Sequence, residues 1–185
     1  MLLKMLGELT EEPQRWSIDP SRVVQAIAVA PPADLHGCTI NMERASRMPY
    51  TRYYLKMLER QVRQRAEHWE AWRTVTPASR LRTIRQFDHW YTAPLAGFSS
   101  TDEYYTTSSS TRWLAKVCVP TLLLIDQHDP IIPYGAFSGH AFSSSISVQV
   151  TRFGGHLGYI ARDRLGHVRR WMDDWTEAIF TRAFA

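Results

Sequence analysis

The chain has 185 residues, of which 44% are hydrophobic and 22% are charged, which is the composition of one globular domain and excludes a disordered or fibrous chain. Its 22 Lys and Arg against 18 Asp and Glu give a formal charge of +4 that is spread along the sequence, too mild to indicate a nucleic-acid-binding protein. No apolar run approaches the roughly 18 residues of a membrane span, so we expect a cytoplasmic protein with no stable membrane insertion.

Three segments have the pattern of β-strands. Residues 23–30 (VVQAIAVA) and 117–125 (VCVPTLLLI) are almost continuously apolar, which is typical of strands buried on both faces of a parallel sheet. Residues 147–153 (SVQVTRF) alternate instead, with Val148 and Val150 on one face, as expected at the edge of the same sheet. The sequence therefore predicts an α/β fold.

Helical patterns fill the intervals between these strands. Two helices are predicted between the first and second strands, where a crossover needs only one, and we interpret residues 36–96 as an inserted helical lid. A third, amphipathic helix is predicted at the C-terminus. The apolar positions that define the three helices are Tyr54, Leu58, Val62, Trp69 and Trp72, then Leu81, Ile84, Tyr91 and Leu95, then Leu165, Val168, Trp171, Met172, Trp175 and Ile179.

Polar residues follow the second and third strands at the point where each ends. The second strand runs into Asp126-Gln127-His128-Asp129, and the third into Gly154-Gly155-His156. Ligands of open α/β sheets bind beyond the carboxyl ends of the strands. An acid at one strand end and a histidine at the next is also the chain order of the last two members of a Ser-Asp-His triad. We therefore predict that Asp129 and His156 are catalytic.

The residue types suit that chemistry. Histidine can take a proton from a serine hydroxyl near neutral pH and return it to a leaving alkoxide, while the acid fixes its tautomer. Asp126 is the rival acid, and we prefer Asp129 because Asp126 sits closer to the sheet. The other histidines form no cluster with metal-ligand spacing, so we expect no metal or organic cofactor. They are His36, His68, His89, His128, His140 and His167.

A nucleophile is harder to find. No G-x-S-x-G motif occurs in the 185 residues, and the nearest approach, residues 97–101 (GFSST), lacks the second glycine and is interpreted as a loop. Cys38 lies too far beyond the first strand for a nucleophile elbow, and Cys118 falls inside the second strand. Both cysteines are predicted to be reduced and buried.

Three motifs carry a family resemblance: PTLLLIDQHDPIIP (120–133), FGGHLGYI (153–160) and FDHWYTAPLAGFSSTDEYYTTSSSTRWL (87–114). They resemble the YheT-like branch of the α/β hydrolases, a group of carboxylesterase- and lipase-type enzymes, and the resemblance covers essentially the whole chain. It implies a single partial α/β-hydrolase domain over 1–185, with the last three parallel strands and their helices. It also implies that the serine lies just upstream of Met1 and that the first strand has an unpaired edge.

The resemblance implies a serine hydrolase that acts on small lipophilic carboxylic esters, here with the acid and histidine of the triad but without the serine. We expect 185 residues of this kind to be inactive alone. The alternative is a non-catalytic interaction module, with self-association through the exposed sheet edge. Nucleic-acid binding is disfavoured because the basic residues that would carry it share their helix with Glu59 and Glu67. Those basic residues are Arg52, Lys56, Arg60, Arg63 and Arg65.

Overall fold

The computed structural model describes residues 1–77 and 79–183, and these form two compact units. The sheet unit comprises Met1–Asp34 and the chain from Ser110 onward. The helical unit comprises Leu35–Ser109. The segment 36–96, interpreted above as a lid, falls within the helical unit, which continues to Ser109.

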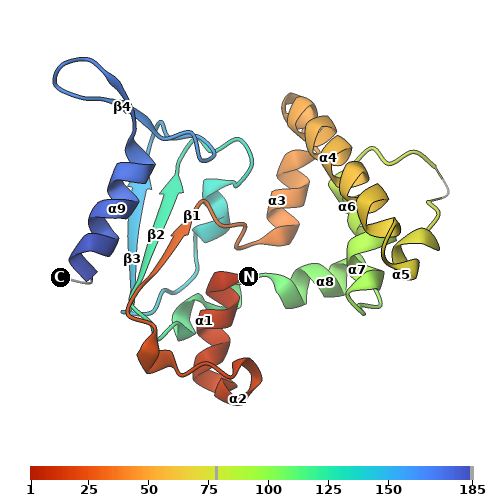
Figure 1. The fold of residues 1–185 in the computed structure, drawn as a ribbon, viewed down its shortest axis with the longest axis horizontal. Helices are drawn as coiled ribbons and strands as arrows, with labels where there is room; N and C mark the ends of the chain where they lie inside the picture. Colours follow the sequence, from red (N-terminus) through yellow and green to blue (C-terminus); the bar gives the residue numbers. More distant parts are fainter. Residues whose placement is uncertain (78, 184–185) are drawn as a thin grey trace. The chain divides into compact units, whose positions relative to one another are not determined.

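Three parallel strands form the sheet, as the sequence predicts (Figure 1). They are β1 (Ala26–Val29), β2 (Thr121–Asp126) and β3 (Ile146–Thr151), in the spatial order β1-β2-β3. In register, Thr121 lies between Ala26 and Ile146. Within the described residues β1 pairs with β2 alone, and β3 likewise has one strand neighbour.

Strand β2 supplies the centre of the core. Leu123 and Leu124 are fully buried, as expected for a strand covered on both faces. The strand begins at Thr121, later than predicted, because Pro120 has no N–H to donate to the ladder. Cys118 therefore lies outside the strand and is exposed, so its predicted burial is wrong, while Cys38 is buried as predicted. Neither cysteine forms a disulfide.

Helix α1 (Leu2–Glu11) packs against a 3₁₀ helix, η4 (Thr111–Lys116), in the sheet unit. The approach is close, because a Cβ on Gly7 would lie 2.6 Å from Cβ of Trp113. Leu3, Leu6 and Leu9 of α1 are fully buried, which accounts for their helical spacing. The shorter helices of this unit are α2 (Pro13–Trp16), η1 (Pro20–Arg22) and η5 (Tyr134–Phe137).

The C-terminal segment differs from its prediction. Residues 165–170 are not helical: an antiparallel hairpin of β4 (Ile160–Arg162) and β5 (Val168–Arg170) precedes helix α9 (Trp171–Ala183). Asp163 and Gly166 close a turn, with Gly166 N donating to Asp163 O (3.0 Å) and Gly166 at φ +85°. Helix α9 reaches the sheet where Trp175 Nε1 donates to Gln149 Oε1 (3.0 Å).

The helical unit has its own apolar core, built on Leu55, Leu81, Phe87 and Tyr91. The predicted helix over residues 54–72 is broken, since α4 (Met48–Ala66) ends at Ala66 and a separate short helix, α5 (Glu70–Arg73), follows. Thr83 starts the next helical run with a capping box, and a π-helical turn at Asp88–Thr92 lies inside that run. The helices are α3 (Leu35–Met42), η2 (Ala45–Arg47), α4 (Met48–Ala66), α5 (Glu70–Arg73), α6 (Ile84–Phe87), α7 (Ala93–Leu95) and α8 (Thr101–Ser108).

The chain leaves the sheet unit after Ala33 and returns to it at Ser110, and hydrogen bonds join these two points. Ala33 O accepts from Ser110 N (2.8 Å) and from Thr111 N (3.3 Å) on the sheet-unit side. On the helical-unit side, Leu35 N donates to Ser109 Oγ (3.0 Å). The outgoing and returning segments therefore lie side by side.

A candidate active site at the carboxyl end of the sheet

Asp129 is fixed in the turn that follows β2. Its Oδ1 accepts hydrogen bonds from the backbone N–H groups of Ile131 (2.7 Å) and Ile132 (3.0 Å), and its side chain is 1% exposed. A buried carboxylate needs such donors, because an unpaired charge in an apolar surrounding is costly. The turn therefore leaves one oxygen, Oδ2, for another partner.

His156 is that partner. Its Nδ1 lies 2.9 Å from Asp129 Oδ2, although the two residues are 27 positions apart in the chain. The imidazole is 20% exposed, so one side is packed in protein while solvent still reaches the ring. With a proton on Nδ1 donated to the carboxylate, Nε2 carries a free lone pair and can act as a base.

The turn that carries His156 has an unusual backbone. Gly155 on one side has φ +59° and Leu157 on the other has φ +62°, so the histidine is flanked by two left-handed residues. This conformation suits glycine but is strained for leucine. The ring of Tyr159 also lies against Gly154, where an added Cβ would be 2.2 Å from a ring carbon. The backbone around His156 is therefore tightly constrained.

Asp126 has a different task from Asp129. Its Oδ2 accepts from Gly154 N (2.6 Å) and Thr151 Oγ1 (2.6 Å), and its Oδ1 accepts from His128 N (2.8 Å). These bonds tie the end of β2 to the start of the histidine turn. Asp126 therefore holds the backbone two residues before His156, while Asp129 faces the imidazole itself.

The electrostatics of Asp126 follow from these bonds. Burial acts to raise the pKa of this carboxyl, but hydrogen bonds from Thr151, Gly154, His128 and Gly155 stabilise the charged form and leave the pKa below its ordinary value. The side chain is thus held as a carboxylate near neutral pH. A charged Asp126 is the form that can accept all of these bonds.

The remaining predicted residues lie apart from this pair. His128 stacks on Phe153 with the ring centroids 5.8 Å apart, and its Nδ1 donates to the backbone oxygen of Arg152. His36 and His167 lie near Asp102 and Asp163 at exposed positions. In the described part of the chain, no group of three or more His, Cys, Asp or Glu side chains is placed to hold a metal ion.

Sequence reasoning did not identify the supporting residues. Thr151 and Tyr159 have no feature in the sequence that distinguishes them from ordinary strand and loop residues. Thr151 is the last residue of β3 and bonds Asp126 across the sheet, which depends on the strand register. The two glycines before His156 were a usable signal for the close approach of Tyr159.

The helical unit also buries an aspartate, Asp88. Tyr105 Oη donates to Asp88 Oδ2 (2.6 Å), and both residues are buried. Burial raises the pKa of Asp88 despite hydrogen bonds from Thr92 and Tyr105. A cavity of about 260 Å³ lies in the same unit between α4 and the run from α6 to α7, lined by Leu58, Gln61, Arg65, Trp72, Phe87, Thr92, Leu95 and Ala96.

Comparison with known proteins identifies related hydrolases. The chain is 27% identical over 157 residues to YheT, a candidate esterase of Escherichia coli (strain K12), a match that covers 81% of this chain and 46% of YheT. It is 27% identical over 126 residues to the mouse phospholipase ABHD3, covering 66% of this chain and 31% of that protein. It is 33% identical over 96 residues to a monoacylglycerol lipase of Saccharomyces cerevisiae, covering 50% and 20%.

The chain spans less than half the length of each of these relatives. No family model matches the sequence. No solved structure matches the chain. These three relatives carry the names of an esterase, a lipase and a phospholipase.

Proposed function

Because the chain belongs to the YheT-like family of α/β hydrolases, we propose that it supplies the acid and the base of a carboxylic ester hydrolase. The observation that carries the proposal is the 2.9 Å contact between His156 Nδ1 and the buried Asp129 Oδ2. In this proposal Asp129 orients and charge-balances His156. His156 serves first as general base and then as general acid.

The proton transfers balance over one turnover. His156 Nε2 removes the proton of a serine hydroxyl as the serine oxygen bonds to the ester carbonyl carbon. The resulting imidazolium then gives that proton to the departing alkoxide as the C–O bond breaks, which leaves an acyl-serine. Water then gives a proton to His156 as its oxygen bonds to the acyl carbon, and His156 returns that proton to the serine oxygen as the acyl–serine C–O bond breaks, which releases the carboxylic acid and restores the serine.

Asp129 contributes by geometry and charge. A hydrogen bond from Nδ1 keeps the proton off Nε2 in the resting state, and the carboxylate stabilises the imidazolium that forms during the reaction. The two backbone N–H groups on Oδ1 hold the carboxylate so that Oδ2 stays on the imidazole. The acid therefore needs no proton of its own.

The proposal requires a nucleophilic serine from a segment other than these 185 residues, since they contain no G-x-S-x-G motif. In this fold the oxyanion hole uses the N–H of the residue after the nucleophile, so the same external segment would supply it. A lipophilic ester is the proposed substrate, because the names of the relatives describe lipase, phospholipase and esterase activities. Intact mass and peptide sequencing of the native protein would show whether such a segment is joined to this chain.

The acid–base geometry can be tested without any turnover. We expect NMR of ¹⁵N-histidine-labelled chain to show His156 as the Nδ1–H tautomer, with that proton shifted strongly downfield by the carboxylate. The signal should disappear in Asp129→Asn and persist in Asp126→Asn, the matched carboxylate that does not face the ring. Loss in Asp126→Asn with retention in Asp129→Asn would reverse the assignment of the acid.

A second candidate function is favoured by one observation: β1 pairs on one side alone within the described residues. An unpaired strand edge is a template for β-sheet addition, so a non-catalytic module that binds another polypeptide through β1 fits it. A fluorophosphonate, which labels activated serines, distinguishes the two. Labelling of the native protein that His156→Ala abolishes supports the hydrolase, and failure to label supports the module.

A further inference from the structure

The β4–β5 hairpin exposes apolar and basic side chains together. Ile160, Leu165 and Val168 are 67%, 82% and 62% exposed, which is unusual for large aliphatic residues. The basic residues of the segment are Arg162, Arg164, Arg169 and Arg170, against a single acid, Asp163. Figure 1 shows the hairpin extending past the carboxyl end of the sheet.

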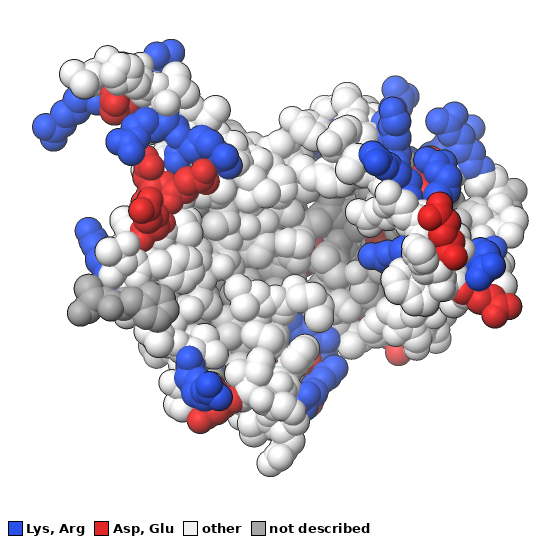
Figure 2. Space-filling view, viewed as in Figure 1, with Lys and Arg blue, Asp and Glu red and all other residues white. Residues whose placement is uncertain are grey.

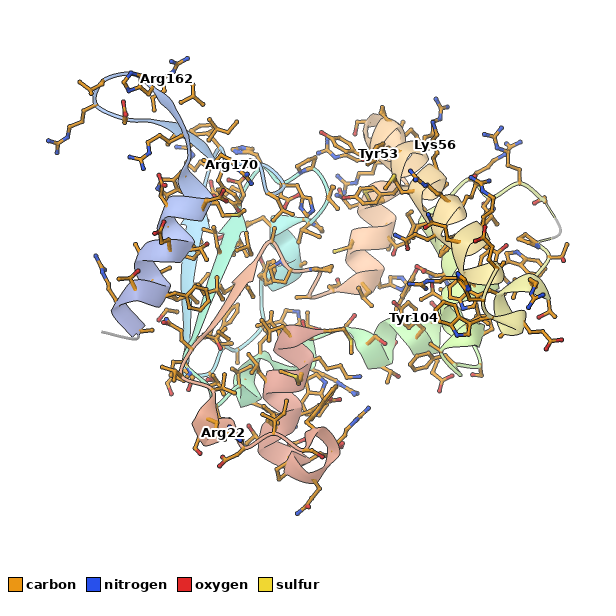
Figure 3. The ribbon with its side chains drawn as sticks, viewed as in Figure 1. Arg22, Tyr53, Lys56, Tyr104, Arg162 and Arg170 are labelled. Carbon is orange, nitrogen blue, oxygen red and sulfur yellow. The ribbon has the colours of Figure 1, made fainter. Side chains whose placement is uncertain are left out.

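Strand pairing places two of these residue types on one face. Ile160 lies opposite Arg170, and Arg162 lies opposite Val168, so the four alternate on the same side of the ribbon. Leu165 occupies the turn beyond them. Figure 3 labels Arg162 in the outer part of the hairpin and Arg170 where the hairpin meets α9.

The one acid of the hairpin is turned inward. Asp163 Oδ1 accepts from Leu165 N (2.8 Å) and His167 N (2.9 Å), and Oδ2 lies 3.2 Å from His167 Nδ1. These bonds close the turn, and they lower the pKa of Asp163 although the small burial of the group acts to raise it. Within residues 160–170 the carboxylate of Asp163 thus bonds to the turn and forms no ion pair with Arg162 or Arg164.

The arginines divide into paired and unpaired positions. At the base of the hairpin, Arg169 Nε lies 3.0 Å from Asp174 and Arg170 Nε lies 3.1 Å from Asp173. Arg162 donates to the backbone oxygen of Gly166, and across residues 1–77 and 79–183 neither Arg162 nor Arg164 forms an ion pair with a carboxylate. Figure 2 shows acidic residues gathered where the hairpin joins α9 and basic residues toward its outer end.

A two-stranded hairpin of this composition has little to stabilise it by itself. All three residues of β5 are exposed, and an isolated hairpin in water is marginal. Apolar side chains between unpaired cations match a lipid–water boundary, where the aliphatic groups enter the headgroup layer and the guanidinium groups bind phosphate and carboxylate headgroups. A hairpin tip with one leucine cannot cross the bilayer.

We propose that the β4–β5 hairpin docks on anionic lipid surfaces, with Leu165 at its tip inserted between headgroups and Arg162 and Arg164 bound to their negative charges. The docking is superficial and reversible, because the apolar area is small. The inference does not rest on the proposed hydrolase activity, since vesicle binding requires no turnover. It assigns an interaction surface to a segment that the acid–base pair does not use.

Vesicle co-sedimentation of the 185-residue chain tests the proposal. We expect binding to vesicles of equal parts phosphatidylcholine and phosphatidylserine and at least about tenfold weaker binding to phosphatidylcholine alone. The double variant R162Q/R164Q should bind the anionic vesicles roughly thirtyfold more weakly, and Leu165→Ser about tenfold more weakly. Arg22→Gln and Val24→Ser, which change exposed residues of the same unit, are the matched controls and should bind like the unchanged chain.

A second measurement guards against variants that misfold. In Leu165→Trp the new indole should shift its fluorescence to shorter wavelength when anionic vesicles are added and stay unshifted with neutral ones. Equal binding to both vesicle types, or equal binding by R162Q/R164Q and the unchanged chain, would overturn the proposal. So would a concentration-dependent dimer that Leu165→Ser abolishes without vesicle binding, or equal affinity for a short DNA duplex.

Discussion

The sheet unit and the helical unit each bury an aspartate against a ring, and the two arrangements differ in what the carboxylate can do. Asp129 takes two backbone N–H groups on one oxygen and presents the other to His156, a side chain that gains and loses protons near neutral pH. Asp88 accepts from the hydroxyl of Tyr105, and burial raises the pKa of that tyrosine far above its ordinary value. Burial is common to both, so the partner decides whether a buried carboxylate is suited to catalysis or to structure.

The largest expected effect is a loss of turnover when the contact between Asp129 and His156 in the sheet unit is removed. Under the proposed hydrolase function we expect Asp129→Asn to lower kcat about ten thousandfold, because the amide favours the wrong tautomer of His156. Steady-state hydrolysis of a p-nitrophenyl ester measures it. Tyr105→Phe, which disturbs the other aspartate, should leave kcat within about threefold, and a comparable loss in both variants would contradict the comparison.

A change in the histidine turn should have the next largest effect. Gly154→Ala places a Cβ 2.2 Å from the Tyr159 ring, so we expect it to lower the free energy of unfolding by about 3 kcal/mol through overpacking. Gly135→Ala is the control, since nothing lies within 4 Å of its added Cβ. Urea unfolding measures both. Equal midpoints would show that the ring gives way easily and that the turn is looser than described.

The helical unit can be weakened alone. Tyr105→Phe removes the donor to Asp88 and leaves a buried carboxylate short of a partner, at a cost of about 2 kcal/mol. Hydrogen exchange should show faster opening of amides in α6 and α8 and unchanged protection in β2. Tyr104→Phe, at the neighbouring ring, serves as the control and should change neither. Loss of protection in β2 as well would mean that the two units unfold together.

The pH dependence of stability should have opposite signs at two aspartates. The folded-state pKa of Asp126 is lowered, so its contribution is present above the unfolded pKa of about 3.9 and is lost as the pH falls through the folded value. The folded-state pKa of Asp88 is raised by burial, so its contribution is fully present below the unfolded pKa and is lost as the pH rises through the folded value.

Urea midpoints of Asp126→Asn and Asp88→Asn, measured between pH 3 and pH 6, separate the contributions of the two aspartates to the pH dependence of stability. Asp126→Asn should flatten the loss of stability in acid, and Asp88→Asn should steepen it, because the opposing term is removed. These are the smallest of the expected effects. A change of slope in the same direction for both variants, relative to the unchanged chain, would show that burial and hydrogen bonding do not act as described.

The sequence was informative where a pattern was continuous and local. The apolar run through Leu123 and Leu124 predicted a buried parallel strand, and the polar residues after it drew attention to Asp129. The bonds of Asp126 to Thr151 and Gly154 could not be predicted, since they depend on the register of β2 and β3. The catalytic roles of Asp129 and His156 stay predictions.

Competing local signals explain the hairpin that sequence reasoning missed. Leu165 and Val168 happen to continue the helical spacing of Trp171 and Trp175, which favoured a helix. The turn residues Asp163 and Gly166 outweigh that pattern, because an aspartate that accepts from the backbone and a glycine at positive φ fix a reversal. Helical spacing at two positions is therefore weaker evidence for a helix than Asp163 and Gly166 are for a turn.

The hydrogen bond between Ala33 and Ser110 makes the helical unit an insertion that begins and ends at one point of the sheet unit, and such an insertion can be exchanged as a cassette. Since the chain departs and returns at neighbouring points, the 75 residues from Leu35 to Ser109 can be lengthened, exchanged or replaced by a short turn without rethreading the sheet. Natural variation and laboratory recombination can both operate at this joint. Related chains could thus change the cassette while inheriting Asp129 and His156 unaltered.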